Sequence, residues 1–171
     1  MDEESQIREW PKLSFSENQK LALACLDSTV VGTIATHNSP RGPWAATVFF
    51  TFDENFGIFF VSQRNTRHMQ DILVDNNVAF SAFTPISKSK GSHIQVQING
   101  LAVPVQESEV EKAYTARERR LTGAGTWLPG IEDIFKVYQT GAVFMVIRPQ
   151  EVWYVNSALF GGDRKLIPVK F

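Results

Sequence analysis

Three consecutive polar residues, Thr66, Arg67 and His68, stand where an apolar, strand-like segment gives way to a helical one, in the stretch FFVSQRNTRHMQDI (residues 59–72). Free backbone N–H groups and the positive end of the helix dipole gather at such a helix start. A guanidinium adds a permanent charge and a bidentate fork, which completes a site suited to phosphate. The residues alone favour a plainer alternative, in which Asn65 or Thr66 is an ordinary N-cap and Arg67 is solvated.

The other chemically active side chains form no known catalytic pattern. The sequence has no paired Cys or His spacing for zinc, no GxSxG, no P-loop and no GxGxxG after a strand. We therefore predict no metal site and name no catalytic residue. The histidines His37, His68 and His93 lie at a turn, a helix start and a strand edge, where each is either a surface or a site residue. A tryptophan just beyond a polar turn, such as Trp44, either packs structurally or walls a ring-shaped ligand.

Composition predicts one globular domain over residues 1–171, because the chain is 43% hydrophobic and 20% charged. Its 17 basic and 18 acidic side chains nearly cancel, so we expect no nucleic-acid partner and no charge-driven membrane binding. No apolar run approaches the roughly 20 residues of a transmembrane helix. Cys25, the single cysteine, is expected in the core, and its lack of a partner together with the acidic N-terminus indicates a cytoplasmic protein.

The first half of the chain predicts a helix followed by an antiparallel meander. Ser14 and Glu17 fit a capping box, which starts a helix over about 16–27. Three segments rich in β-branched and aromatic residues follow, separated by short stretches of turn formers: 29–36, 44–52 and 58–62. Strands joined by such short turns pair with their neighbours in antiparallel fashion.

The second half is also dominated by strands. The expected elements are a helix at 65–76, a strand at 78–83, a mobile lysine-bearing loop at 85–92, a strand at 93–106, a helix at 107–120, one or two helical turns at 131–139, a strand at 142–156 and a last strand around 165–170. In the strand 93–106, Ile94, Val96 and Ile98 should face one side and the polar residues between them the other. Many strands with few helices indicate an antiparallel β-barrel with peripheral helices, whose closure removes exposed edges.

The order of these elements and three of their segments, WAATVFFTF, IFFVSQRNTRHMQDILVDNNVAFSAF and IQVQINGLA, resemble one known family. It is the pyridoxamine 5'-phosphate oxidase-like family of FMN-binding split barrels. The resemblance covers roughly residues 28–105 and continues more weakly to the end. It implies a mainly β fold, an antiparallel split β-barrel of the FMN-binding type, with residues 1–27 as an N-terminal segment and helix.

The resemblance also implies which residues hold the cofactor. In the family a Ser/Thr-Arg-Lys triplet at the helix start and the preceding strand bind the phosphate, a glutamine meets the flavin, and one strand runs along the isoalloxazine ring. The matching or neighbouring positions here are Ala45, Ala46, Thr47, Val48, Phe60, Val61, Ser62, Thr66, Arg67, His68 and Gln95. Trp153 and Asn156 are added as candidates to line the ring or a substrate cavity, without a family match.

Several positions depart from the family pattern. Vitamin B6 oxidases carry basic residues where this chain has Ala45 and Phe50, and the lysine of the triplet is His68. The arginine-bearing substrate segment of those enzymes is not recognisable in residues 152–165. Each lost phosphate contact costs about 1.5–3 kcal/mol, which Ser62 and its turn neighbours would have to offset. The resemblance therefore points to another branch of the superfamily and not to the vitamin B6 oxidase itself.

The resemblance implies a homodimer with FMN in the cleft between two barrels. Its implied function is a flavin-dependent oxidoreductase that acts on a small molecule, and a hydride-accepting flavin needs no catalytic acid or base from the protein. The alternative is a flavin-, haem- or deazaflavin-binding module without turnover, serving as carrier, sensor or stress protein. A scaffold with an empty cleft is the third alternative.

Overall fold

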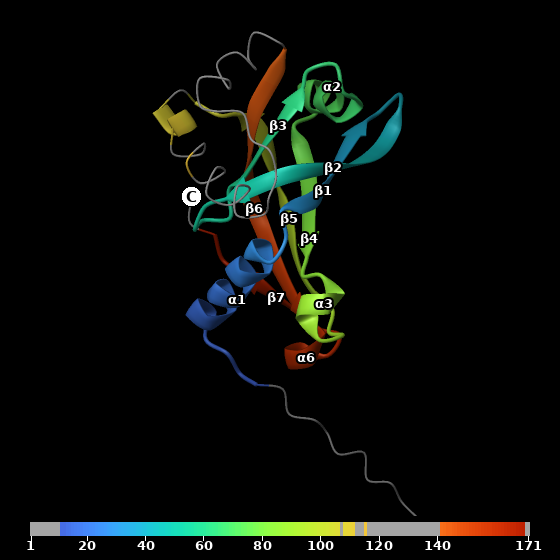
Figure 1. Cartoon of the computed structure of the whole chain (residues 1–171). Helices are drawn as coiled ribbons and strands as arrows, with labels where there is room; N and C mark the ends of the chain where they lie inside the picture. The colour runs from blue at the N-terminus through green and yellow to red at the C-terminus, as the bar shows by residue number, and fades with distance from the viewer. Residues whose placement is uncertain (1–10, 107, 112–114, 116–140, 170–171) are drawn as a thin grey trace, which may run out of the picture.

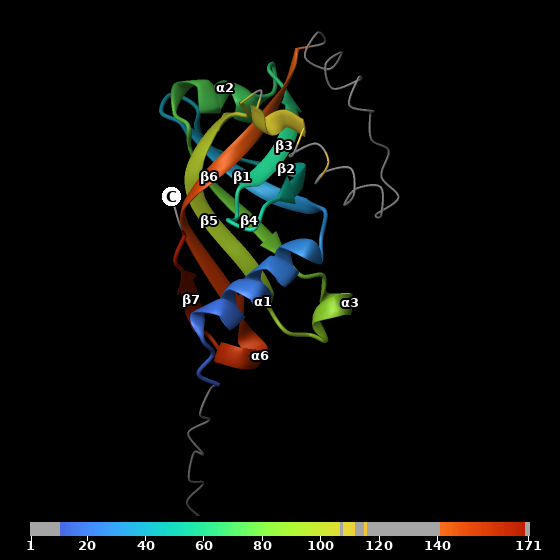
Figure 2. The same cartoon turned by 90° about the vertical axis from the view of Figure 1, so that its left-hand side faces the viewer.

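The computed structural model describes residues 11–106, 108–111, 115 and 141–169. Within these residues one seven-stranded antiparallel sheet has the order β3-β2-β1-β4-β5-β6-β7 and curls until β3 also pairs with β6 (Figures 1 and 2). That pairing closes a barrel of which β7 is not part. The strands are β1 (Val31–Asn38), β2 (Gly42–Phe52), β3 (Ile58–Gln63), β4 (Asn77–Phe83), β5 (Ile94–Pro104), β6 (Ala142–Asn156) and β7 (Arg164–Ile167).

Short helices cover the barrel and its two ends. They are α1 (Phe15–Asp27), α2 (Arg67–Val74), α3 (Ile86–Ser89) and α6 (Ser157–Phe160). Figure 1 places α2 at the upper end of the barrel and α3 and α6 at the lower end. The predicted capping box starts α1, since Ser14 accepts from the Glu17 amide while Glu17 accepts from the Ser14 amide. Cys25 packs in the core on the inner side of α1, and burial raises the pKa of its thiol.

Large aromatic side chains fill the barrel. Phe50, Phe80 and Tyr154 are almost fully buried, and the rings of Phe50 and Phe80 meet edge to face with centroids 5.0 Å apart. Gly32 on β1 makes room for this packing, because a Cβ atom there would lie 2.3 Å from the Phe80 ring. A smaller apolar cluster on the outside of β3 and β6 is centred on Phe144.

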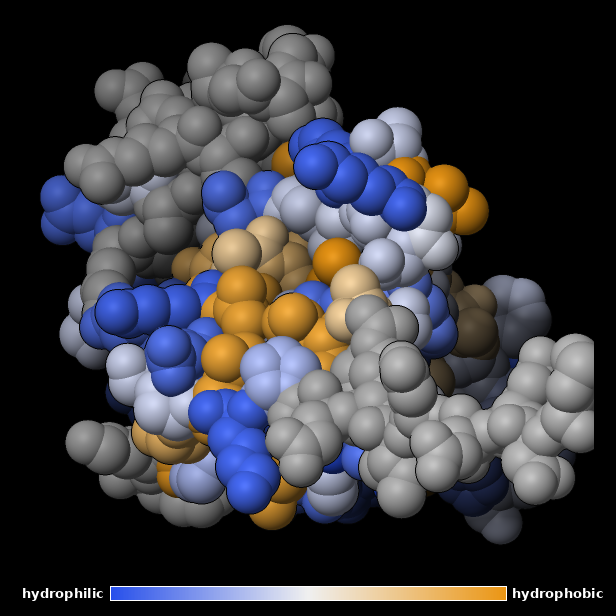
Figure 3. All heavy atoms as spheres, turned by 90° about the horizontal axis from the view of Figure 1, so that it is seen from below, coloured by the Kyte–Doolittle hydropathy of each residue, from blue (hydrophilic) through white to orange (hydrophobic). Residues whose placement is uncertain are grey.

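Seen from below, hydrophobic side chains gather in the middle of the surface, bordered by hydrophilic ones (Figure 3). Several large hydrophobic side chains of the described chain are exposed: Phe15, Val31, Trp44, Phe49, Leu73, Val74, Phe83, Ile86 and Leu166.

The structure confirms the β-rich meander and the alternation along β5, where Val96 and Ile98 are buried and Asn99 is exposed. Two details were not predicted: the expected loop 85–92 contains the single turn α3, and α6 follows β6 directly. Residues 108–111 are helical, and the rest of the predicted helix 107–120 lies outside the described residues except for Thr115. The helical turns predicted at 131–139 also lie outside them. Among the described residues, no helix is both long and apolar enough to cross a membrane.

Candidate cofactor site

Three side chains of the predicted anion site meet at the junction of β3 and α2. Ser62 comes from the end of β3, and its Oγ atom lies 2.7 Å from Nε2 of His68 and 3.3 Å from Oγ1 of Thr66. The Thr66 hydroxyl also donates to the Gln63 carbonyl at 2.8 Å. Burial lowers the pKa of His68, and the nearby Asp71 carboxylate only partly opposes this effect. The ring is therefore neutral at neutral pH, and His68 brings hydrogen-bonding capacity rather than the charge of a lysine.

The start of α2 lacks a side-chain cap. Thr66 occupies the N-cap position, as the plainer alternative supposed, but its side chain accepts no capping hydrogen bond from a backbone amide of the helix. The first turn also carries no acidic residue. The free N–H groups and the positive end of the helix dipole thus remain available to an anion.

Arg67 lies across the β1–β2 turn. Its Nη2 atom donates to the carbonyl of Arg41 at 2.7 Å, and the guanidinium carbon lies 4.5 Å from the centroid of the Trp44 ring. Such stacking on an aromatic face orients a guanidinium while leaving part of its donor fork accessible. The Arg67 side chain is 32% exposed.

Asp71, one helical turn after Arg67, forms ion pairs with both Arg41 and Arg67. Its carboxylate is fully buried, accepts from the Thr36 hydroxyl at 3.1 Å and from Arg41 Nη2 at 2.7 Å, and lies 3.8 Å from Arg67 Nε. Gln70 accepts from the other end of the Arg41 guanidinium at 3.2 Å. The cluster of two arginines and one carboxylate keeps one net positive charge. Without Arg41, the pair of Arg67 and Asp71 would be neutral.

One donor in this cluster lies 3.8 Å from the Asp71 carboxylate, within ion-pair distance, but has no hydrogen-bond acceptor in the described chain. Within the described chain, Arg67 Nε is buried and makes no hydrogen bond. A buried guanidinium donor beside an uncapped helix start is unfavourable unless an acceptor is supplied. The donor set therefore fits a phosphate group, which offers several strong acceptor oxygens and the opposite charge.

The outer face of the sheet provides a second part of the site. Because successive strand residues point to opposite faces, the register aligns outward side chains in rows across the strands. One row consists of Thr47, Thr33, Ser81, Gln97 and Trp153, and the next of Ala45, Ala35, Ala79, Asn99 and Glu151. The side chains from β1 and β4 are all small, so the face is flat at its centre.

A groove of about 430 Å³ lies over β1, β4, β5 and β6 on this face. Trp153 forms part of its wall, and the guanidinium carbon of Arg164 lies 4.4 Å from the Trp153 ring centroid. Gln95, half-buried, stands one row further on, paired with Val155. The groove thus combines small side chains, an aromatic wall and polar groups, which is the usual make-up of a ligand site.

Five of the predicted site residues have side chains that belong to the fold. Phe60 and Val48 are buried in the barrel core, and Ala46 packs against it. Asn156 is buried, accepts from the amides of Ala158 and Leu159 to cap α6, and donates to the Tyr154 hydroxyl at 2.8 Å. Phe60, Val48 and Ala46 have their side chains in or against the core, so they could contact a ligand on the outer face only through their backbone atoms. Val61 faces the cluster around Phe144.

The remaining predicted residues fall into two groups. Ser62, Thr66, Arg67 and His68 gather at the α2 end of the barrel, while Ala45, Thr47, Gln95 and Trp153 share the outer face of the sheet.

Sequence reasoning did not find Arg41, Asp71 or Arg164. Asp71 had a usable signal, since an acid four residues after Arg67 in a helix can pair with it. Arg41 lies in a turn and reaches the site only through the tertiary fold.

Known proteins place this geometry in context. The family model described as Pyridoxamine 5'-phosphate oxidase matches residues 19–156, which run from within α1 to the end of β6. No curated protein sequence matches the chain.

Solved structures give the same fold at low sequence identity. The heme binding protein from Mycobacterium smegmatis matches with a TM-score of 0.66 and 20% identity, over 91% of this chain and 58% of that one. The FAD binding protein from the same organism matches with a TM-score of 0.56 and 18% identity, over 84% and 95%. General Stress Protein 26 from Bacillus anthracis matches with a TM-score of 0.57 and 17% identity, over 80% and 92%. This chain thus spans little more than half of the heme binding protein.

Proposed function

Since this chain belongs to the pyridoxamine 5'-phosphate oxidase family, we propose that it binds flavin mononucleotide on the outer face of the barrel. The phosphate lies at the start of α2, and the isoalloxazine ring lies along β2. The observation that carries this proposal is the buried Nε of Arg67, which makes no hydrogen bond within the described chain and sits beside the uncapped helix start.

The phosphate end is held by charge and by hydrogen bonds. Arg67 supplies the fork, and Arg41 offsets the buried carboxylate of Asp71 so that the cluster stays cationic. Ser62 and Thr66 contribute hydroxyl groups, and neutral His68 orients Ser62 through their 2.7 Å contact. These groups replace the basic contacts that Ala45 and His68 do not provide.

The ring end is favoured by the flat outer face. The small side chains of Ala45 and Thr47 leave the β2 backbone accessible, and Gln95 and Trp153 present polar and aromatic groups from the same face. Figure 1 places α2 and the start of β5, where Gln95 lies, toward opposite ends of the barrel, which suits an elongated cofactor.

A second copy of the chain is proposed to cover this face. Val31, Phe49, Phe83 and Leu166 point outward from the same side of the sheet and are 39%, 49%, 60% and 51% exposed. Burying them against an identical surface would remove a large apolar patch from water. Sedimentation velocity at micromolar concentration tests this, and a monomer that still binds flavin would refute it.

The proposed activity is that of a flavin-dependent oxidoreductase acting on a small molecule. Bound FMN supplies two-electron redox chemistry, while the protein binds, orients and shields it. The alternative is a flavin, haem or deazaflavin module without turnover. Anaerobic mixing with reduced nicotinamides and other donors separates the two, because bleaching of the bound flavin supports turnover and inert flavin across all donors refutes it.

The binding proposal is tested by titrating the purified protein with FMN and with riboflavin, which lacks the phosphate. Quenching of flavin fluorescence should give a markedly tighter Kd for FMN. Mass spectrometry of any chromophore released from the purified protein adds a direct identification. Equal affinities for the two flavins, or a released haem, would contradict the proposal.

A further inference from the structure

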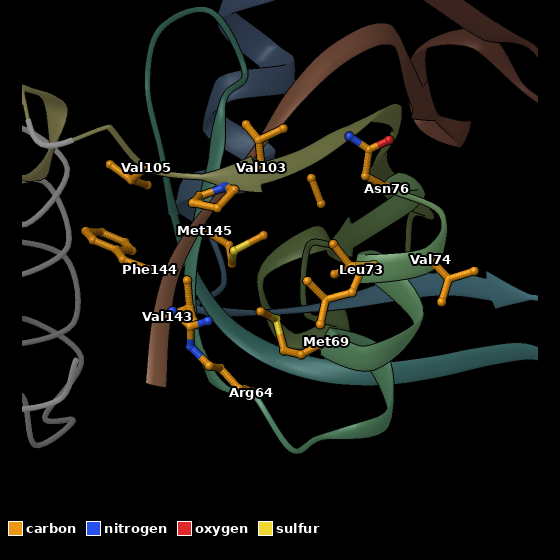
Figure 4. Close-up of a pocket in the computed structure, with 13 residues that line it drawn as sticks. Arg64, Met69, Leu73, Val74, Asn76, Val103, Val105, Val143, Phe144 and Met145 are labelled. Carbon is orange, nitrogen blue, oxygen red and sulfur yellow. The ribbon is translucent and has the colours of Figure 1, made fainter. Parts of the chain in front are cut away.

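A second pocket, separate from the outer face of the sheet, lies between α2 and the adjoining ends of β5 and β6 (Figure 4). Its volume is about 460 Å³, within the range of small-molecule sites. The floor consists of buried side chains of the barrel core, among them Met69, Ile72 and Met145. The pocket therefore opens into the end of the barrel that α2 covers.

The mouth of the pocket is apolar and exposed. Leu73 and Val74, at the end of α2, both line it and are 79% and 69% exposed. Contact of these two side chains and of the apolar floor with water is unfavourable. A bound hydrocarbon group would remove this apolar surface from water.

Among the described residues that line the pocket, Arg64 and Asn76 alone carry polar side chains. Figure 4 shows them on different sides of the pocket, with the apolar side chains of Met69, Leu73 and Met145 between them. The backbone of Arg64 is fixed, since its amide donates to the Gly141 carbonyl at 3.0 Å. Within the described chain, the Arg64 guanidinium has neither a hydrogen bond nor an ion pair. Its charge is thus free to meet an anion at the rim of an apolar cavity.

From this combination we infer that the pocket binds an apolar carboxylic acid, with its hydrocarbon body against the floor and its carboxylate at Arg64. An apolar body gains affinity by burial, about fourfold for each methylene removed from water. The guanidinium adds a fork that a carboxylate fills and an alcohol does not. The pocket shares no lining residue with the cluster of Arg41, Arg67 and Asp71, so its ligand would not compete with the flavin phosphate for these side chains.

The test is a calorimetric titration of the protein, with and without FMN, by hexanoate, octanoate and decanoate, and by octanol as the neutral match of octanoate. We expect saturable binding at one site, affinity that rises with chain length until the cavity is filled, and octanoate bound about fivefold more tightly than octanol. The Arg64→Gln variant should lose this preference while its octanol affinity stays unchanged. Lys20→Gln removes a cation from the distant α1 and serves as the matched control.

Leu73→Ser shortens the apolar wall at a position that is exposed, so the fold should survive the change. It should weaken octanoate and octanol to the same extent, by about fivefold. The inference is overturned if octanoate shows no saturable binding at millimolar concentration, or if Arg64→Gln binds octanoate as the unchanged protein does. Failure of flavin binding in the same titrations would contradict only the proposed function.

Discussion

The carboxylate of Asp71 and the guanidinium of Arg41 lie 2.7 Å apart, and they join the middle of α2 to the turn between β1 and β2. The carboxylate is fully buried, whereas Arg41 is 40% exposed. This ion pair fixes α2 against the hairpin and so determines where the Arg67 guanidinium lies. The first turn of α2 and the β1–β2 turn therefore act as one unit at the proposed phosphate end.

Replacement of Arg67 should weaken binding of the FMN phosphate and leave binding of the flavin ring unchanged. Arg67→Ala removes a charge-assisted contact worth about 1.5–3 kcal/mol, so FMN affinity should fall at least tenfold. Riboflavin affinity should stay within about twofold, because no phosphate is present. Fluorescence titrations measure both values, with Lys20→Ala as the control. Unchanged FMN affinity would mean that the phosphate binds elsewhere.

Loss of the buried carboxylate should destabilise the fold. Asp71→Asn keeps the shape but removes the charge opposite Arg41, and we expect a loss of about 1–3 kcal/mol in the free energy of unfolding, reduced by the partial exposure of Arg41. Urea denaturation of Asp71→Asn, Arg41→Ala and the double variant gives the coupling energy. Strictly additive effects of the two changes would show that the ion pair contributes nothing.

His68 should make stability depend on pH. Burial lowers the pKa of His68 in the folded state, so the unfolded chain takes up a proton more readily. Stability from this residue is complete above the ordinary histidine pKa of about 6.5 and is lost as the pH falls through that value toward the folded pKa. The slope cannot exceed about 1.4 kcal/mol per pH unit, the effect of one proton.

The measurement is denaturant unfolding of the protein and of His68→Gln between about pH 7 and pH 5. The variant should show a shallower loss of stability over this window. His93→Gln is the matched control, since His93 is exposed. Parallel pH profiles for the protein and the His68 variant would contradict the expectation.

Gly100 should tolerate no side chain. A Cβ atom at this position would lie 2.2 Å from the carbonyl oxygen of Arg148, where the pairing of β5 with β6 changes register. Gly100→Ala should therefore cost about 1–3 kcal/mol or more in unfolding free energy. Gly162→Ala, which meets no atom within 4 Å, should change stability by no more than about 0.5 kcal/mol. Equal thermal midpoints for the two variants would contradict this expectation. They would mean that β5 and β6 can move apart enough to accommodate the added methyl group.

Much of the fold follows from local pattern. The alternation of apolar and polar residues along β5 and the capping box at Ser14 are local signals, and the structure confirms both. The single turns α3 and α6 cannot be predicted in this way, because each is too short to show helical periodicity. Asn156 is instructive, since its position suggested a ligand contact but its side chain caps α6.

The site was only partly predictable for a related reason. Thr66, Arg67 and His68 are neighbours in the sequence, so their gathering at a helix start could be expected. The contacts of Arg41 with Asp71, and of Arg164 with Trp153, join residues from different elements. No spacing in the sequence encodes such pairs, and only the sheet register brings the groove residues together.

The β3–β6 pairing has a kinetic consequence. It joins Gln63 to Ala142, residues far apart in the chain, whereas β1, β2 and β3 connect through short turns. Closing a long loop costs more entropy than closing a short one, and such contacts form late in folding. Of the pairings in the barrel, this one joins the residues that lie furthest apart in the sequence, and its opening would separate Ser62 from its β6 partner Val143 while leaving the β1–β2–β3 meander paired.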